Sequence, residues 1–270
     1  MTAAPGASEA TVNAGDERIA AAFAGHGRSA ALMPYLMGGF PNIESSRAAG
    51  IGCVEAGADV IELGIPFSDP LADGPVIHAA ATEALAAGVT PGEVLGVCES
   101  LAARVPVVLM VYANAIQVTG PERFVARAAE AGAAGLIVPD LPHDEAAELR
   151  AACDAGGLAL VPLAAPTTTA ERLAQIAADA RGFVYTVSLS GTTGERERLP
   201  EDLSDTVDRV RAAASVPVAV GFGVSTPEQA ALVAELADGV IVGSRVVRAA
   251  GEGGAEAVAE LVGQLAAALG

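Results

Sequence analysis

Three carboxylates lie in one short segment that is rich in proline and glycine, residues 62–75. Glu62 follows an apolar run, while Asp69 and Asp73 follow prolines that exclude a regular helix or a central strand. We therefore expect Glu62 at the end of a strand and both aspartates on a stiff loop. Two carboxyl groups in such different surroundings are what acid–base chemistry near neutral pH requires. A tight turn with solvated acids is the competing interpretation.

A second group of residues has the small side chains that let backbone N–H groups approach a phosphate. It consists of two glycine turns and a glycine-rich segment: Gly221-Phe222-Gly223 with Ser225, Gly243-Ser244, and residues 191–194. Ordinary turns between strands and helices are the alternative interpretation.

The chain contains no lysine, because all 15 of its basic residues are arginine. This excludes Schiff-base chemistry and a Walker-type phosphate loop, both of which need a lysine. The histidines and cysteines are dispersed, without the spacing of a metal site, a catalytic triad or a disulfide framework: His26, His78, His143, Cys53, Cys98 and Cys153.

The charge and composition of the chain limit the kinds of partner that it can bind. The formal net charge of −18 argues against nucleic acid and anionic membranes as partners. No apolar run approaches the ~18–20 residues of a membrane span. Residues 1–15 resemble neither a signal peptide nor a structured element, so we expect a disordered tail and a cytoplasmic protein.

From residue 16 onward, short apolar runs alternate with alanine-rich segments of helical periodicity, which indicates one domain over residues 16–270. The expected strands cover residues 32–38, 59–64, 106–112, 135–140, 159–165, 182–188, 217–223 and 239–244. The expected helices cover residues 16–26, 45–56, 82–85, 91–101, 121–131, 143–155, 169–178, 202–214, 227–235, 246–250 and 255–269.

Strands that are apolar on both faces and alternate with helices are typical of a parallel sheet covered by helices. We predict a single α/β domain, a (β/α)8 TIM barrel with an additional N-terminal helix; an open doubly wound sheet is the alternative. In such barrels the working face is the carboxyl end of the strands. Glu62, Tyr35 and Tyr185 would meet there. Asp140 also ends a strand, either as a substrate contact or as a structural acceptor.

Seven motifs in this order resemble the tryptophan synthase alpha subunit family: residues 34–41, 62–75, 112–114, 138–142, 191–194, 221–225 and 242–244. The resemblance covers residues 16–269 and implies a lyase of tryptophan biosynthesis. Its reaction is the retro-aldol cleavage of indole-3-glycerol phosphate to indole and glyceraldehyde 3-phosphate. The resemblance also implies a beta-subunit partner in an alpha2beta2 tetramer, and neither a cofactor nor a metal.

The resemblance assigns roles by matching motif positions. Glu62 becomes the acid/base and Asp73 the second catalytic acid. The implied substrate-binding residues are Tyr35, Tyr185, Thr193, Gly194, Phe222, Gly223, Gly243 and Ser244. The implied partner-interface residues are Pro66, Asp69, Pro70 and Asn114.

The chemistry of the cleavage agrees with these roles. The ring carbon C3 of the indole must gain a proton before the ring can leave, and the hydroxyl beside that carbon must lose one. A carboxylate beside the ring N–H stabilises the positive charge that results. Leu189 and Thr192 depart from residues common in the family, which bears on closure of the loop over 189–199. Tyr35 stands where the family commonly has phenylalanine.

Two other functions compete with this interpretation. One is a related phosphate-binding barrel, either phosphoribosylanthranilate isomerase or indole-glycerol-phosphate synthase. The synthase uses a lysine, and the isomerase needs a cysteine at a strand end; this chain has neither. The other is a barrel that binds phosphate only to regulate a partner, against which the presence of both Glu62 and Asp73 argues.

Overall fold

The computed structural model describes residues 14–187, 202–221 and 223–270. Its parallel strands form one sheet in the order β5-β4-β3-β2-β1-β9-β8-β7-β6. The strands are β1 (Ala31–Met37), β2 (Ile61–Gly64), β3 (Val107–Met110), β4 (Gly135–Ile137), β5 (Ala159–Val161), β6 (Leu163–Ala164), β7 (Val184–Val187), β8 (Val218–Gly221) and β9 (Gly239–Val242).

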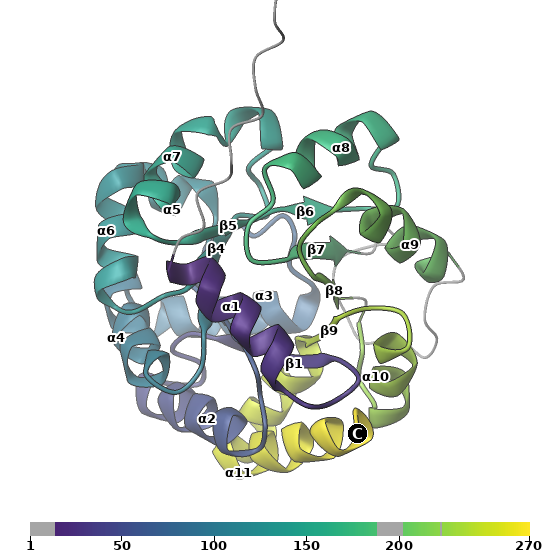
Figure 1. Cartoon of the computed structure of the whole chain (residues 1–270). Coiled ribbons are helices and arrows are strands. Elements are labelled where there is room, and N and C mark those ends of the chain that lie inside the picture. Colours follow the sequence, from purple (N-terminus) through teal and green to yellow (C-terminus); the bar gives the residue numbers. More distant parts are fainter. Residues whose placement is uncertain (1–13, 188–201, 222) are drawn as a thin grey trace, which may run out of the picture.

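The two ends of this sheet are joined by the chain itself, because β5 and β6 are separated by Pro162 alone. Proline has no N–H group and interrupts the hydrogen-bond ladder of a strand. The Pro162 carbonyl still accepts a hydrogen bond of 2.9 Å from the Tyr185 N–H. The expected fifth strand is thus present in two pieces, and the predicted (β/α)8 barrel is confirmed (Figure 1).

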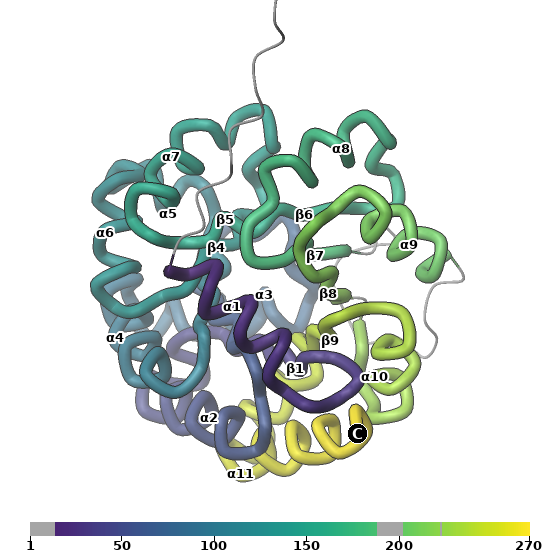
Figure 2. Tube along the Cα trace, viewed as in Figure 1, coloured from purple at the N-terminus to yellow at the C-terminus, as the bar shows by residue number. Residues whose placement is uncertain are grey.

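The helices lie around the outer side of the sheet, apart from α1 at one end of the barrel, as the tube in Figure 2 shows. They are α1 (Ala14–Gly25), α2 (Ile43–Glu55), α3 (Pro75–Ala86), α4 (Pro91–Ala102), α5 (Ala113–Gln117), α6 (Pro121–Glu130), η1 (His143–Glu145), α7 (Ala147–Gly156), α8 (Ala170–Ala178), α9 (Leu203–Ala213), α10 (Pro227–Ala234) and α11 (Ser244–Ala268). Most coincide with expected helices to within a few residues.

Four features of the helices differ from expectation. Helix α1 begins at Ala14 and so includes the last two residues of the predicted tail over 1–15, while residues 1–13 lie outside the described part of the chain. Helix α3 begins at Pro75 instead of near residue 82, because proline is compatible with the first helical position. The short helix α5 was not predicted. The two last expected helices join in α11 across a kink at Gly254.

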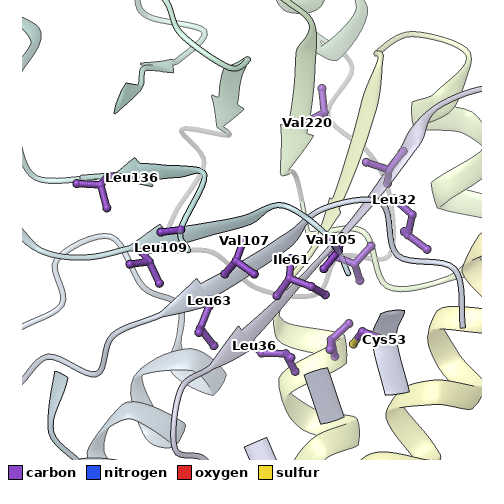
Figure 3. Close-up of a cluster of buried hydrophobic side chains, with 14 of the residues drawn as sticks. Leu32, Leu36, Cys53, Ile61, Leu63, Val105, Val107, Leu109, Leu136 and Val220 are labelled. Atoms are coloured by element: carbon purple, nitrogen blue, oxygen red, sulfur yellow. The ribbon is translucent and has the colours of Figure 1, made fainter. Parts of the chain in front are cut away.

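Two buried layers hold the barrel together. Alternate strand residues face outward and pack against the surrounding helices, among them Leu32, Ile61, Leu63, Val107 and Leu109 (Figure 3). The residues between them face the barrel interior, where Met33, Val108, Val161, Tyr185 and Ala219 belong to a second cluster. This division follows from the two-residue period of a strand.

Helix α1 crosses one end of the barrel (Figure 1). Its Ile19 is fully buried in the interior cluster, and the Phe23 ring lies 5.7 Å from that of Phe183. The Arg18 guanidinium donates hydrogen bonds to the carbonyls of Gly132 and Ala102, at 2.8 and 2.6 Å. Apolar and polar contacts together close this end, so the opposite end, where the strands terminate, is left for a site.

Candidate active site

Glu62 projects into the barrel from β2, since its neighbours Ile61 and Leu63 belong to the outer apolar layer. Its side chain is fully buried, and neither carboxylate oxygen has a hydrogen-bond partner among the described residues. Burial, followed by the charge of Asp73, raises the pKa of Glu62 from 4.5 to about 8. A carboxyl group in this state is protonated at neutral pH and ready to donate a proton.

Asp73 lies on the loop that joins β2 to α3, one residue before the α3 N-cap Gly74. Burial raises its pKa from 3.8 to about 6, while a hydrogen bond with the Tyr112 hydroxyl and the nearby charge of His78 lower it. Asp73 is therefore mostly ionised at pH 7. The structure brings the two predicted acids into electrostatic contact and gives them opposite protonation states.

All three tyrosines of the chain lie around this carboxyl pair. Tyr35 is the neighbour of Glu62 across the β1–β2 ladder, and Tyr185 comes from β7. Burial, with added repulsion from the Glu62 and Asp73 charges, raises the pKa of Tyr35 and Tyr185 above the ordinary value. Both phenols therefore stay protonated. Each contributes an apolar ring and one neutral hydroxyl group to the surroundings of the carboxyl pair.

Two glycines make room for these phenols. A β-carbon on Gly64 would lie 2.1 Å from the Tyr35 hydroxyl oxygen, and one on Gly221 would lie 2.5 Å from that of Tyr185. Both distances are too short for any real contact. Gly64 at the end of β2 and Gly221 at the end of β8 thus leave the space that the two phenols occupy. The sequence did not reveal this role for Gly64.

Two helices, α10 and α11, begin after the neighbouring strands β8 and β9. Gly243 is the N-cap of α11, and the next residue, Ser244, is buried. Gly223 has φ of +74°, a left-handed conformation that glycine adopts without strain. Thr226 caps α10 by accepting a hydrogen bond of 3.3 Å from the Gln229 N–H. Helix N-termini present N–H groups that favour anions, so the expected phosphate site stays a prediction for this part of the barrel.

A β-carbon on Gly243 would lie 3.8 Å from the Tyr35 β-carbon. The N-terminus of α11 and the carboxyl pair therefore both lie beside Tyr35. Three of the predicted binding residues, Thr193, Gly194 and Phe222, lie outside the described residues, as do Leu189 and Thr192.

The predicted interface residues differ in exposure. Asp69 and Asn114 are exposed, Pro70 is half-buried, and Pro66 is buried. Two apolar side chains that the sequence analysis did not single out are strongly exposed nearby in the chain: Leu71 at 84% and Val118 at 79%. Leu71 could have been predicted as an interface residue, because it follows Pro70 in the loop that carries the other predicted interface residues.

Other predicted candidates have structural roles. The Asp140 carboxylate accepts a hydrogen bond of 2.8 Å from the Ala113 N–H, which supports its interpretation as a structural acceptor. No group of three or more histidine, cysteine or acidic residues suited to a metal ion occurs among the residues described. Tyr112 and His78 influence Asp73 but were not predicted as site residues; the sequence marked Tyr112 only as the end of a strand and as part of the motif over 112–114.

These features define a (β/α)8-barrel enzyme with a carboxyl pair at the carboxyl end of its strands. The family model described as tryptophan synthase alpha chain matches residues 23–268. The alpha chain of Prochlorococcus marinus is 49% identical over 89% of this chain and 87% of its own length. That of Geobacter sulfurreducens is 46% identical over 86% of this chain and 89% of its own length. A structure of Mycobacterium tuberculosis tryptophan synthase superposes with a TM-score of 0.89 at 41% identity, over 93% of this chain and 98% of that one.

The chain belongs to the tryptophan synthase alpha chain family. The resemblance stated from the motifs is thereby confirmed, as are the lyase activity and the alpha reaction of tryptophan biosynthesis, cleavage of indole-3-glycerol phosphate. Membership also implies a beta-subunit partner. No helix in the described parts of the chain has the length and apolarity needed to cross a membrane.

Proposed function

We propose that Glu62 is the acid/base and Asp73 the second catalytic acid in the cleavage of indole-3-glycerol phosphate by this chain. The observation that carries the proposal is the divergence of their pKa values, to about 8 for Glu62 and about 6 for Asp73. Near pH 7 the first is a proton donor and the second an anion, and the cleavage needs one of each.

The reaction uses these two states in sequence. Protonated Glu62 transfers its proton to C3 of the indole, and the positive charge that develops on the ring nitrogen is stabilised by ionised Asp73 through the ring N–H. Glu62, now a carboxylate, takes the proton of the hydroxyl group beside C3. The oxygen lone pair forms the aldehyde carbonyl, the carbon–carbon bond breaks, and its electrons return to the ring. Indole and glyceraldehyde 3-phosphate leave, and Glu62 is protonated again.

The remaining residues bind the two ends of the substrate. Tyr35 and Tyr185 form the walls around the indole, together with Phe222. Gly223, Gly243 and Ser244 hold the phosphate at the N-termini of α10 and α11, completed by Thr193 and Gly194. Support comes from the nearness of Gly243 to Tyr35, since a β-carbon on Gly243 would lie 3.8 Å from that of Tyr35.

The chain acts as the alpha subunit of an alpha2beta2 tetramer in the cytoplasm, and residues 16–270 serve as one catalytic domain. The partner binds at the end of the barrel that carries Pro66, Asp69, Pro70 and Asn114. The exposed apolar side chains Leu71 and Val118 support an interface there, since large apolar groups left in water mark binding surfaces.

Indole release from indole-3-glycerol phosphate tests the residue roles, with and without a beta subunit. The chain has no tryptophan, so indole fluorescence is followed against a low background. Asp73→Asn and Glu62→Gln should each lower kcat by about 10²- to 10⁴-fold. Asp208→Asn, an exposed aspartate on α9, should keep full activity. Normal indole release by Asp73→Asn would contradict its role, and no turnover by the unaltered chain in either condition would favour a regulatory barrel.

A further inference from the structure

Tyr112 occupies a rigid position beside the loop that carries Asp73. It is buried at 3% exposure and is the N-cap residue of α5. Its chain neighbours are fixed to β4 and to the segment after it: the Val111 N–H donates to the Ile137 carbonyl at 3.0 Å, and the Ala113 N–H donates to Asp140 at 2.8 Å. The ring therefore projects from a well-anchored piece of backbone.

Three contacts join this ring to the loop between β2 and α3. The Tyr112 hydroxyl accepts a hydrogen bond of 3.1 Å from the Ala72 N–H. The same hydroxyl is hydrogen-bonded to the Asp73 side chain. The Phe67 ring is stacked on the Tyr112 ring at 5.0 Å between centroids, with 18° between their planes. One side chain thus contacts the loop near both of its ends.

The direction of the hydrogen bonds follows from the donors available. A backbone N–H can only donate, so the hydroxyl oxygen accepts from Ala72 and its proton is directed to the Asp73 carboxylate. A hydrogen bond to an ionised acceptor is stronger than one between neutral groups. Tyr112 therefore favours the ionised form of Asp73 as well as its position.

Few other interactions hold this loop. Among the described residues, the hydrogen bond from Ala72 to Tyr112 is the only one that ties the backbone of residues 66–73 to another element. The Ser68 hydroxyl donates to Asp69 within the loop itself. The prolines stiffen the loop and Pro66 is buried against the barrel, but the hydrogen-bonded attachment of the loop depends on Tyr112.

We propose that Tyr112 is a positioning residue that holds Asp73 beside the substrate, through its hydrogen bonds to Ala72 and Asp73 and its stacking on Phe67. The inference rests on the role of Asp73 proposed above. It assigns Tyr112 no contact with the substrate, and it predicts that the free alpha chain already holds Asp73 in place without its partner.

The test is Tyr112→Phe in the full chain without the beta subunit, which removes the hydroxyl and keeps the stacked ring. Loss of a hydrogen bond to a charged group should lower kcat for indole release by about 10- to 100-fold. KM should change by less than about threefold, since ground-state binding is not affected. The acidic limb of the pH profile should move to higher pH, because Asp73 loses a donor that favours its ionised form.

Phe67→Leu is the matched control, because it removes the stacked ring and keeps the hydroxyl; its acidic limb should stay in place. An unchanged kcat in Tyr112→Phe, a rise in KM alone, or an equal shift of the acidic limb in Phe67→Leu would overturn the proposal. So would general unfolding of Tyr112→Phe, followed by circular dichroism. Asp73→Asn is measured alongside Tyr112→Phe. If Asp73→Asn stays fully active, the proposed role of Asp73 is wrong. If Asp73→Asn loses activity and Tyr112→Phe does not, only the proposed role of Tyr112 is wrong.

Discussion

The charge of Asp73 raises the pKa of Glu62, although the two carboxyl groups are eleven positions apart and belong to a loop and a strand. Because Glu62 is the more buried group, it takes up a proton first and leaves Asp73 ionised. The barrel wall and the loop that follows it thereby turn two similar side chains into an acid and an anion. Four predictions follow from this arrangement and from the fold that supports it.

The pH–rate profile of indole formation should be bell-shaped. The profile of kcat/KM reports groups of the free enzyme. We expect it to rise near pH 6 as Asp73 ionises and to fall above about pH 8 as Glu62 loses its proton. A phosphate monoester also titrates near pH 6, so binding of glycerol phosphate is measured in parallel to separate that contribution. A profile flat from pH 6 to 9 would contradict the assignment.

Glu62 should make the fold less stable as the pH rises. Its pKa is 4.5 as an ordinary group and about 8 in the folded chain, so between these values the folded state binds more protons than the unfolded state. Stability therefore falls with rising pH across that window. Each pKa unit corresponds to about 1.4 kcal/mol. The free energy of unfolding of Glu62→Gln, relative to that of the unaltered chain, should therefore rise by roughly 2–4 kcal/mol from pH 5 to pH 8.5.

Urea denaturation at several pH values measures this difference. The matched control is Glu99→Gln, an exposed glutamate on α4, whose difference from the unaltered chain should not change over the same range. A gain by Glu62→Gln that is the same at pH 5 and pH 8.5 would show that its carboxyl group is not perturbed by burial.

Most of the barrel could be predicted because its strands are apolar on both faces and its helices have clear starts. Buried parallel strands leave an unbroken apolar run in the sequence, and caps such as Thr90 before Pro91 mark where a helix begins. The division of the fifth strand at Pro162 and the early start of α3 at Pro75 were missed. Both are proline effects whose outcome depends on the neighbouring chain.

The site was predictable in part, for a related reason. Glu62 and Asp73 stand out because charged groups in apolar or proline-rich surroundings are unusual. The contact between Tyr112 and Ala72 could not be foreseen, since it joins residues forty positions apart through the three-dimensional course of a loop. The burial of Pro66 was likewise hidden, because it follows from how that loop packs.

Adding a methyl group at Gly221 should displace the Tyr185 phenol. The new carbon would lie 2.5 Å from the hydroxyl oxygen and 2.8 Å from a ring carbon. Gly221→Ala should therefore cost about 1–3 kcal/mol of stability by overpacking, and lower kcat/KM because the displaced ring enters the substrate space. Gly96→Ala on α4 is the control, because the new carbon would have no heavy atom within 4 Å apart from its chain neighbours and the backbone of its own helix. It should stabilise the chain by about 0.5–1 kcal/mol and leave activity unchanged.

Truncating Ile19 should weaken the fold without affecting the chemistry. This side chain of α1 is fully buried at the end of the barrel opposite the strand termini, in contact with the interior cluster. Ile19→Ala should lower the free energy of unfolding by about 2–5 kcal/mol, from lost burial and the cavity left behind. Glu17→Ala, an exposed change on the same helix, should have almost no effect. Urea denaturation and kcat are measured on both variants. Because the cavity lies far from Glu62, kcat of the folded fraction should not change, and a parallel fall in kcat would show that α1 also shapes the catalytic end.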